Sequence, residues 1–197
     1  MKKGHLVIVM LLTMITFSTS AQTLQDFKTK LANCGMKLNI PPGFIESKII
    51  ENHDMGYDYA IKNQDGDFEL RYAVRPITQT TYANDNEKKM MEDHITFRNT
   101  SYKIILTTIL INVAGGGPVT KLGEYNDIAV KKEYNADWGG NVIAEPKSDF
   151  GKGFQKCMIV TIHKKDKADA YFFFMFNTKE KFMECAVPLF HSMQFEE

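Results

Sequence analysis

The chain has 197 residues, of which 44% are hydrophobic and 24% are charged, with 13 Gly and 6 Pro. This composition excludes a disordered, collagen-like or low-complexity protein. The 24 basic residues equal the 24 acidic residues in number, so the chain lacks the basic excess that is typical of proteins that bind nucleic acid or anionic lipid. We therefore expect no nucleic-acid partner.

The first 21 residues have the three parts of a secretory signal, in order. Two lysines give the positive start, residues 6–17 are an apolar stretch, and the small residues Thr19 and Ala21 precede Gln22. The apolar stretch is shorter than the ~20 residues that span a bilayer, which disfavours the alternative of an uncleaved membrane anchor. We predict cleavage between Ala21 and Gln22, a secreted or periplasmic location, and no transmembrane segment after signal removal.

The first half of the mature chain shows helical and strand periodicity in turn. The predicted elements are a helix over 23–32, a strand over 36–40, strands over 57–62 and 68–75, a polar loop over 77–86 and a long helix over 87–113. The turn sequence Asn-Gln-Asp-Gly between the second and third strands predicts a β-hairpin. The run Gly-Gly-Gly-Pro that follows residue 114 predicts a firm end to the long helix.

The second half is predicted to consist mainly of strands. The predicted elements are strands over 127–134, 141–144, 154–163 and 170–176, loops over 135–140, 146–152 and 164–169, and a closing helix over 178–193. The strand over 170–176 (AYFFFMF) is apolar on both faces, so it should be central and covered on both sides. Thr178 can cap the closing helix, and Pro188 should kink that helix or end it early.

Strands and helices without an internal repeat or a linker predict a single α+β domain over 22–197, an antiparallel sheet flanked by helices. Two short motifs accompany this order of elements: Pro-Pro-Gly-Phe at 41–44 and Ser-Met-Gln-Phe at 192–195. With them the chain resembles the PsbP-like α/β/α sandwich superfamily over residues 23–195. The resemblance implies a non-enzymatic binding or assembly module. Because the superfamily has no shared catalytic motif, it implies no functional residue.

The residues that most often carry chemistry form no recognisable motif. Cys34, Cys157 and Cys185 allow three disulfide pairings, or they are small buried thiols, and we favour buried thiols. His163 follows Cys157 by six residues, which on a strand means the same face but a separation of ~20 Å. The histidines have no metal-ligand spacing. We therefore expect no cofactor, no metal and no catalytic residue that the sequence alone can name.

One segment is a candidate binding loop. Asn135, Asp137 and Trp138, the only tryptophan, lie together before two glycines. Aromatic side chains on loops often contact partners, so these three residues are our candidate binding residues. The alternative is that Trp138 folds back onto the core and the glycines provide the turn.

These observations favour an exported, non-catalytic binding or assembly module with a protein or small-molecule partner. The first alternative is an enzyme of unrecognised, hydrolase-like type, which needs at least two convergent titratable groups with strained pKa values in one cleft. The second is a structural component of the cell envelope, which would self-associate without a ligand. The binding hypothesis instead predicts an exposed apolar patch.

Overall fold

The structure is a computed structural model that describes residues 23–77 and 84–197. The predicted signal segment with its cleavage site, and residues 78–83 of the predicted polar loop, lie outside the described residues. Among the described residues, no helix has both the length and the apolar character needed to cross a membrane.

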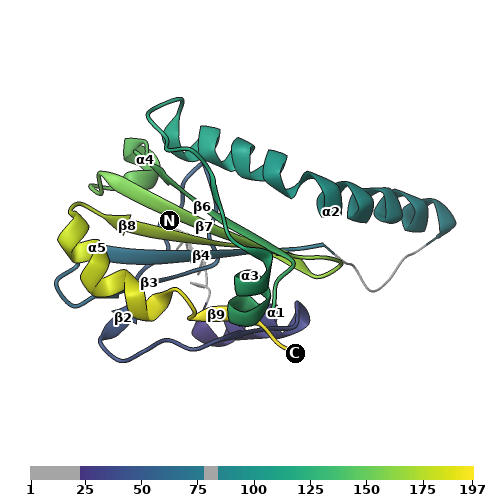
Figure 1. The fold of residues 1–197 in the computed structure, drawn as a ribbon, viewed down its shortest axis with the longest axis horizontal. Coiled ribbons are helices and arrows are strands. Elements are labelled where there is room, and N and C mark those ends of the chain that lie inside the picture. Colours follow the sequence, from purple (N-terminus) through teal and green to yellow (C-terminus); the bar gives the residue numbers. More distant parts are fainter. Residues whose placement is uncertain (1–22, 78–83) are drawn as a thin grey trace, which may run out of the picture.

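Seven antiparallel strands form the main sheet, in the order β2-β3-β4-β8-β7-β6-β5 (Figure 1). Their bounds are β2 Phe44–Glu46, β3 Tyr59–Asn63, β4 Phe68–Pro76, β5 Gly123–Glu124, β6 Trp138–Ala144, β7 Lys156–Lys164 and β8 Ala168–Phe176. A second, two-stranded sheet pairs β1 (Met36–Leu38) with β9 (Met193–Phe195). The predicted hairpin is confirmed as β3–β4, with Tyr59 opposite Tyr72.

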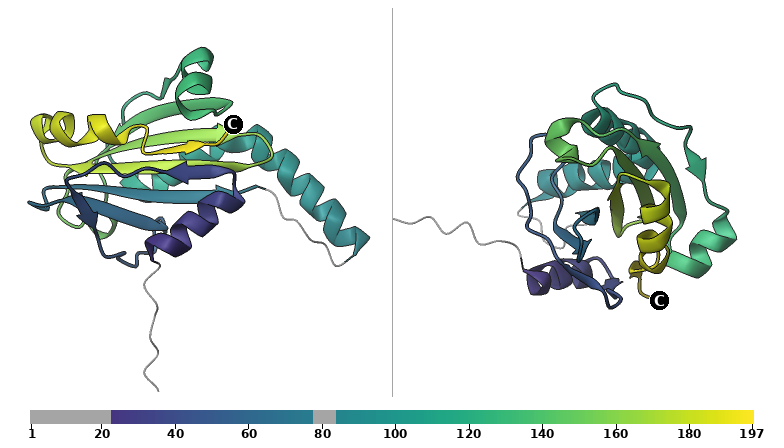
Figure 2. Two further views of the ribbon diagram at one scale, coloured as in Figure 1. Left: turned by 90° about the horizontal axis from the view of Figure 1, so that it is seen from below. Right: turned by 90° about the vertical axis from the view of Figure 1, so that its left-hand side faces the viewer.

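Helices cover both faces of the main sheet (Figure 2). Their bounds are α1 Leu24–Asn33, α2 Asp85–Ala114, α3 Asp127–Tyr134, α4 Ser148–Gly151, α5 Lys179–Ala186 and the 3-10 helix η1 Val187–Leu189. In Figure 1, α2 and α4 lie over one face, and α1, α3 and α5 lie over the other. The prediction of a single α+β domain with an antiparallel sheet flanked by helices is therefore confirmed.

The side chains of each strand alternate between two cores. On the α1/α3/α5 face, Tyr72, Phe172 and Phe174 belong to one apolar cluster. On the α2/α4 face, Tyr171 and Phe173 belong to the other. All nine residues of β8 are buried, and this strand is the fourth of seven. The prediction of a central strand covered on both sides is confirmed.

Two predicted helix ends and one predicted N-terminal cap act as expected. Gly115 follows α2 with a φ of 61°, a left-handed conformation that glycine adopts without strain. Thr178 accepts a hydrogen bond from the backbone N–H of Lys181 and caps α5. Pro188 lies in η1, directly after α5, so the closing helix ends early. Met193 lies in β9 and not in the helix stripe, which corrects the predicted end of that helix.

The predicted strand over 127–134 is wrong, because this segment is helix α3. The Asn126 side chain accepts hydrogen bonds from the backbone N–H groups of Ile128 and Ala129, which caps the helix at its start. Val130 and Tyr134 are both buried, four residues apart. Apolar residues at that spacing suit one helix face as well as an alternating strand, so the sequence pattern was ambiguous.

The loops predicted on either side of the next strand are each wrong in part. Residues 138–140 begin strand β6 instead of ending a loop. Residues 146–152 contain the short helix α4. The two glycines that suggested a flexible loop lie within the sheet, where a missing side chain lets other groups approach closely.

Candidate functional site

The three predicted binding residues do not form one exposed loop. Asn135 ends α3 with a φ of 49°, and its side-chain amide donates to the backbone carbonyl of Glu196. Asp137 is exposed, and its carboxylate accepts a hydrogen bond of 2.9 Å from the backbone N–H of Lys165. Trp138 begins β6 and is only 6% exposed, as the core-packing alternative predicts. A binding role for these residues stays a prediction.

Trp138 belongs to a cluster that fastens α2 to the edge of the sheet. Its indole N–H donates to the Glu124 carboxylate at 2.9 Å, and Lys103 Nζ donates to the same oxygen at 2.6 Å. The Tyr102 ring packs against both the Trp138 ring (centroids 4.9 Å apart) and the His163 ring (4.3 Å apart). The Lys103 ammonium holds the pKa of Glu124 below its ordinary value, so this carboxylate is ionised at neutral pH.

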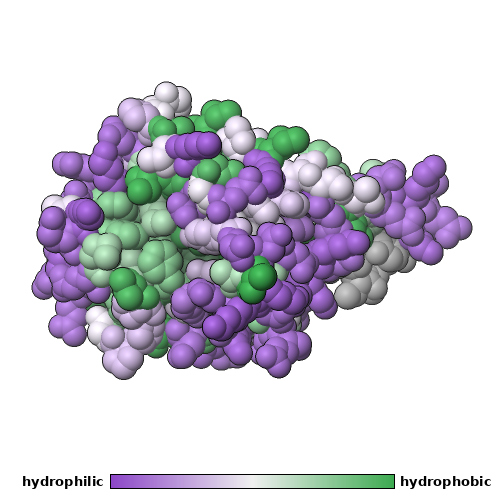
Figure 3. All heavy atoms as spheres, viewed as in Figure 1, coloured by the Kyte–Doolittle hydropathy of each residue, from purple (hydrophilic) through white to green (hydrophobic). Residues whose placement is uncertain are grey.

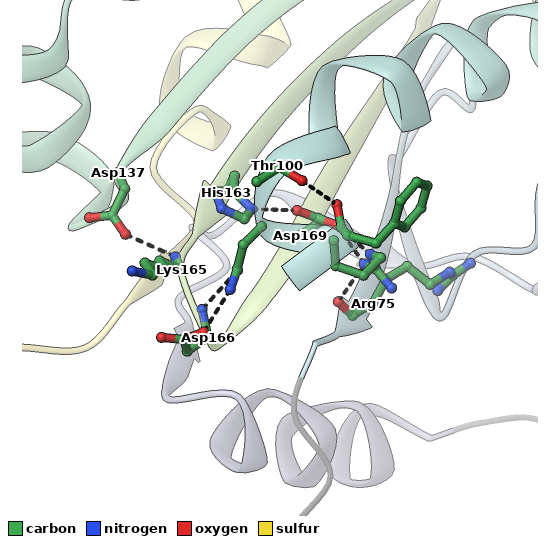
Figure 4. A network of polar contacts seen from close by, with 10 residues as sticks. Arg75, Thr100, Asp137, His163, Lys165, Asp166 and Asp169 are labelled. Atoms are coloured by element: carbon green, nitrogen blue, oxygen red, sulfur yellow. Dashed lines mark hydrogen bonds and ion pairs between the residues drawn. The ribbon is translucent and has the colours of Figure 1, made fainter. Parts of the chain in front are cut away.

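A second polar cluster lies beneath α2 at the β7–β8 hairpin (Figure 4). His163 Nδ1 lies 2.7 Å from Asp169 Oδ1. Arg98 Nη2 and Nε donate to Asp169 Oδ2 at 2.5 and 3.2 Å, and Arg98 Nη2 also donates to the Arg75 carbonyl. Both carboxylate oxygens of Asp169 are therefore bonded, although this side chain is fully buried. The cluster joins α2, β4 and the hairpin.

A histidine oriented by a buried carboxylate also occurs in hydrolases, where it activates a nucleophile. Here the His163 residue is only 3% exposed, and the Tyr102 ring stacks on its imidazole. Cys157 lies opposite Met175, six residues along β7 from the His163–Asp169 pair, which puts it ~20 Å away. With no open side for a substrate and no thiol beside it, we assign this cluster a structural role.

An open groove of about 530 Å³ lies between α3 and the segment that follows α5. Ala129, Val130 and Tyr134 of α3 form one wall, and Val187 and Phe190 form the other. Val187 is 57% exposed, so part of this apolar surface faces solvent. Figure 3 shows a patch of apolar surface on this face of the molecule, beside α5 and the neighbouring strands.

Polar groups line the rest of the groove. His191 Nε2 lies 2.6 Å from Glu133 Oε2, and both side chains are about half exposed. The Tyr134 ring centroid lies 5.2 Å from that of His191. Burial raises the pKa of Tyr125, so its hydroxyl stays protonated well above neutral pH. An apolar cleft with a few polar groups is the usual form of a small-molecule site, and this groove is our candidate functional site.

Gly139 lets the floor of the groove come close to the sheet. A Cβ atom on this residue would lie 3.1 Å from Tyr125 Cδ2 and 3.2 Å from Val130 Cγ2, both closer than most Cβ contacts. Its hydrogen atom therefore allows Tyr125 and α3 to pack directly on β6. This close approach sets the distance between α3 and the strands under it.

Sequence reasoning missed both features for identifiable reasons. The groove combines residues 124–134 with residues 187–191, and residues 127–134 of the first segment were predicted to be a strand. The His163–Asp169 pair was open to prediction, because a tight turn between two strands places residues six apart directly opposite each other. The predicted loop over 164–169 is too long, because β7 ends at Lys164 and β8 begins at Ala168, and it leaves Asp169 outside the strand.

The described residues contain no group of three or more His, Cys, Asp or Glu that could hold a metal ion. Cys34, Cys157 and Cys185 are free and buried. Burial raises the pKa of the Cys157 thiol to about 12. A thiol with so high a pKa is a poor nucleophile at neutral pH.

No protein-family model matches the chain, and no curated protein matches it. Among solved structures, the fold resembles the solution structure of cyanobacterial PsbP (CyanoP) from Synechocystis sp. PCC 6803. The two chains are 11% identical, and the alignment covers 83% of this chain and 88% of the other, with a TM-score of 0.38. The resemblance expected from the order of elements is thus present, at a weak level and in the fold alone.

Proposed function

We propose that this protein is an exported, non-catalytic binding module whose ligand lies in the groove between α3 and η1. The observation that carries this proposal is an open apolar cleft, walled by Val130, Val187 and Phe190, in a domain whose two buried cores are filled by their own side chains. The groove suits a small, largely apolar molecule that can also accept or donate a hydrogen bond at Glu133, His191 or Tyr125.

The exported location rests on the sequence of residues 1–21. Sequencing the amino terminus of protein purified from the producing cell tests it. We expect the first residue to be Gln22, in the envelope or extracellular fraction. A cytoplasmic pool that begins at Met1 would refute export and would leave the proposal for the groove untouched.

A neutral fluorescent probe, N-phenyl-1-naphthylamine, tests the groove, because its emission rises when it leaves water for an apolar site. Val187→Glu places a carboxylate on the wall of the groove, and we expect it to weaken probe binding at least tenfold. Ile128→Glu is the matched control, since Ile128 is 79% exposed on α3 but does not line the groove. The proposal fails if the two variants bind the probe equally well, provided that thermal unfolding shows both to be folded.

A further inference from the structure

Helix α2 has an apolar surface that none of the described residues covers. Met90, Phe97, Ile104 and Ile111, here called the outer stripe, are 73%, 54%, 65% and 60% exposed. They account for four of the ten exposed large hydrophobic residues described. The opposite side of α2 supplies the residues that pack on the sheet, Leu106, Ile109 and Val113. The outer stripe therefore faces away from the body of the molecule.

Threonines widen this apolar surface. The hydroxyls of Thr96, Thr100, Thr107 and Thr108 each donate to a backbone carbonyl four residues earlier. Because these hydroxyls are hydrogen-bonded within the helix, the threonines present their methyl groups to a partner. Between Phe97 and Ile111 the helix carries two charged residues, Arg98 and Lys103. Arg98 is paired with Asp169, and Lys103 is paired with Glu124.

The spacing of the outer stripe identifies the kind of partner. Its members are seven residues apart, and a seven-residue repeat drifts by only ~20° per heptad around a helix. Such a repeat forms the seam between two helices that coil around each other. From Met90 to Ile111 the stripe is ~32 Å long at 1.5 Å per residue. The N-terminal half of α2 also projects past the end of the sheet (Figures 1 and 2), which leaves it open to a second helix.

The charges on α2 favour a second copy of the same helix in antiparallel order. Residues 87–94 carry five acidic or basic side chains, whereas residues 107–114 carry none. A parallel pair would instead place the two charged halves side by side, with Asp93, which lies close to the stripe, beside its own copy. An antiparallel pair centred between Thr100 and Ser101 places each charged half beside a neutral half. It also sets Met90 opposite Ile111 of the second copy, and Phe97 opposite Ile104.

We infer that two copies of this protein associate through the outer stripe of α2, as an antiparallel helix pair about a two-fold axis near Thr100. Because the stripe faces away from the sheet, the two domains lie on opposite sides of the helix pair and do not collide. The surface belongs to the face of the sheet opposite the groove, so the dimer leaves both grooves open. The inference is independent of the proposed function.

Sedimentation equilibrium of the purified protein tests the association. We expect the wild-type protein to reach twice the monomer mass as its concentration rises, and Phe97→Glu/Ile104→Glu to stay monomeric at every concentration. Ile128→Glu/Val187→Glu is the control, because these two residues are 79% and 57% exposed but belong to α3 and η1 and not to the outer stripe, and it should still dimerise. A monomeric wild-type protein, or dimerisation that the α2 variant retains, would overturn the inference.

Cysteine cross-linking tests the antiparallel order, since the three native cysteines are buried. Thr100→Cys lies at the two-fold axis and should form a disulfide-linked dimer under mild oxidation. Met90→Cys alone should not, whereas Met90→Cys/Ile111→Cys should. Cross-linking of Met90→Cys alone would show a parallel pair and refute the proposed order. Binding of the wild-type monomer to neutral phosphatidylcholine vesicles through the stripe would identify a membrane as the occupant and refute the dimer.

Discussion

The part of the chain that the structure describes contains two histidine–carboxylate pairs of nearly equal length in opposite environments. His163 and Asp169 lie 2.7 Å apart under α2, with side chains 3% and 0% exposed. His191 and Glu133 lie 2.6 Å apart at the groove, with side chains 52% and 46% exposed. The short distance alone therefore says little about what either pair does. Burial, and the partners that burial requires, separates a structural cluster from a surface that a ligand can reach.

The energetic difference between the two pairs follows from solvation. An exposed ion pair is worth ~0–1 kcal/mol, because water solvates its members almost as well as they solvate each other. A buried charge that loses its partner costs ~3–5 kcal/mol. The α2/α4 face should therefore be sensitive to polar substitutions, and the groove on the other face should tolerate them. The following predictions test that contrast.

Asp169→Ala should have the largest effect. The change removes the carboxylate that accepts bonds from both His163 and Arg98, so Arg98 keeps its charge in a mostly buried position. We expect the free energy of unfolding to fall by ~3–5 kcal/mol, measured by urea denaturation. Glu133→Ala is the control at the exposed pair and should cost no more than ~1 kcal/mol. Equal losses in the two variants would contradict the contrast between the faces.

Gly139→Ala should have the next largest effect. The new methyl group would crowd the Tyr125 and Val130 side chains and push α3 away from β6. Overpacking of this kind costs ~1–3 kcal/mol, and binding of the naphthylamine probe should change with it. The control is Gly123→Ala, whose Cβ would meet only Asn141 at an ordinary 3.5 Å. If both alanine variants unfold at the same urea concentration, Gly139 does not set the position of α3.

The Cys157 thiol should make stability fall at alkaline pH. Burial raises its pKa from 9.0 to about 12 in the folded protein, so the folded state holds its proton where the unfolded state has lost it. The resulting stability is complete below pH 9 and is lost as pH rises from about 9 to 12. Between pH 9 and about pH 10.5, Cys157→Ala should lose ~2 kcal/mol less than the wild-type protein. Parallel stability curves for the two proteins would refute this account.

Thr178→Ala should have the smallest effect. The Thr178 hydroxyl accepts a hydrogen bond of 3.3 Å from the Lys181 backbone N–H at the start of α5, and losing such a cap costs ~1 kcal/mol. Because α5 leads into the groove wall at Val187, thermal unfolding and probe binding should both weaken slightly. Lys179→Ala, an exposed change one residue later, should alter neither measurement. A Thr178 variant as stable as this control would show that the cap contributes nothing.

Local patterns in the sequence determined much of the fold. The alternation in residues 68–75, the turn sequence before it and the uniformly apolar run at 170–176 predicted a hairpin and a central strand, because side-chain period and burial follow directly from strand geometry. Helical spacing and the Gly115 stop likewise predicted α2. The outer stripe of α2 follows the same helical spacing, but no pattern in the sequence shows that this face of the helix stays exposed.

Tertiary structure decided what local pattern left open. The segment 127–134 satisfies both helix and strand periodicity, and only the Asn126 cap and the packing of Val130 and Tyr134 on the sheet select the helix. The groove then exists because α3 and η1, more than fifty residues apart in sequence, pack side by side on one face. Burial depends on every neighbour at once, so no short stretch of sequence could show that one histidine is enclosed and the other open to solvent.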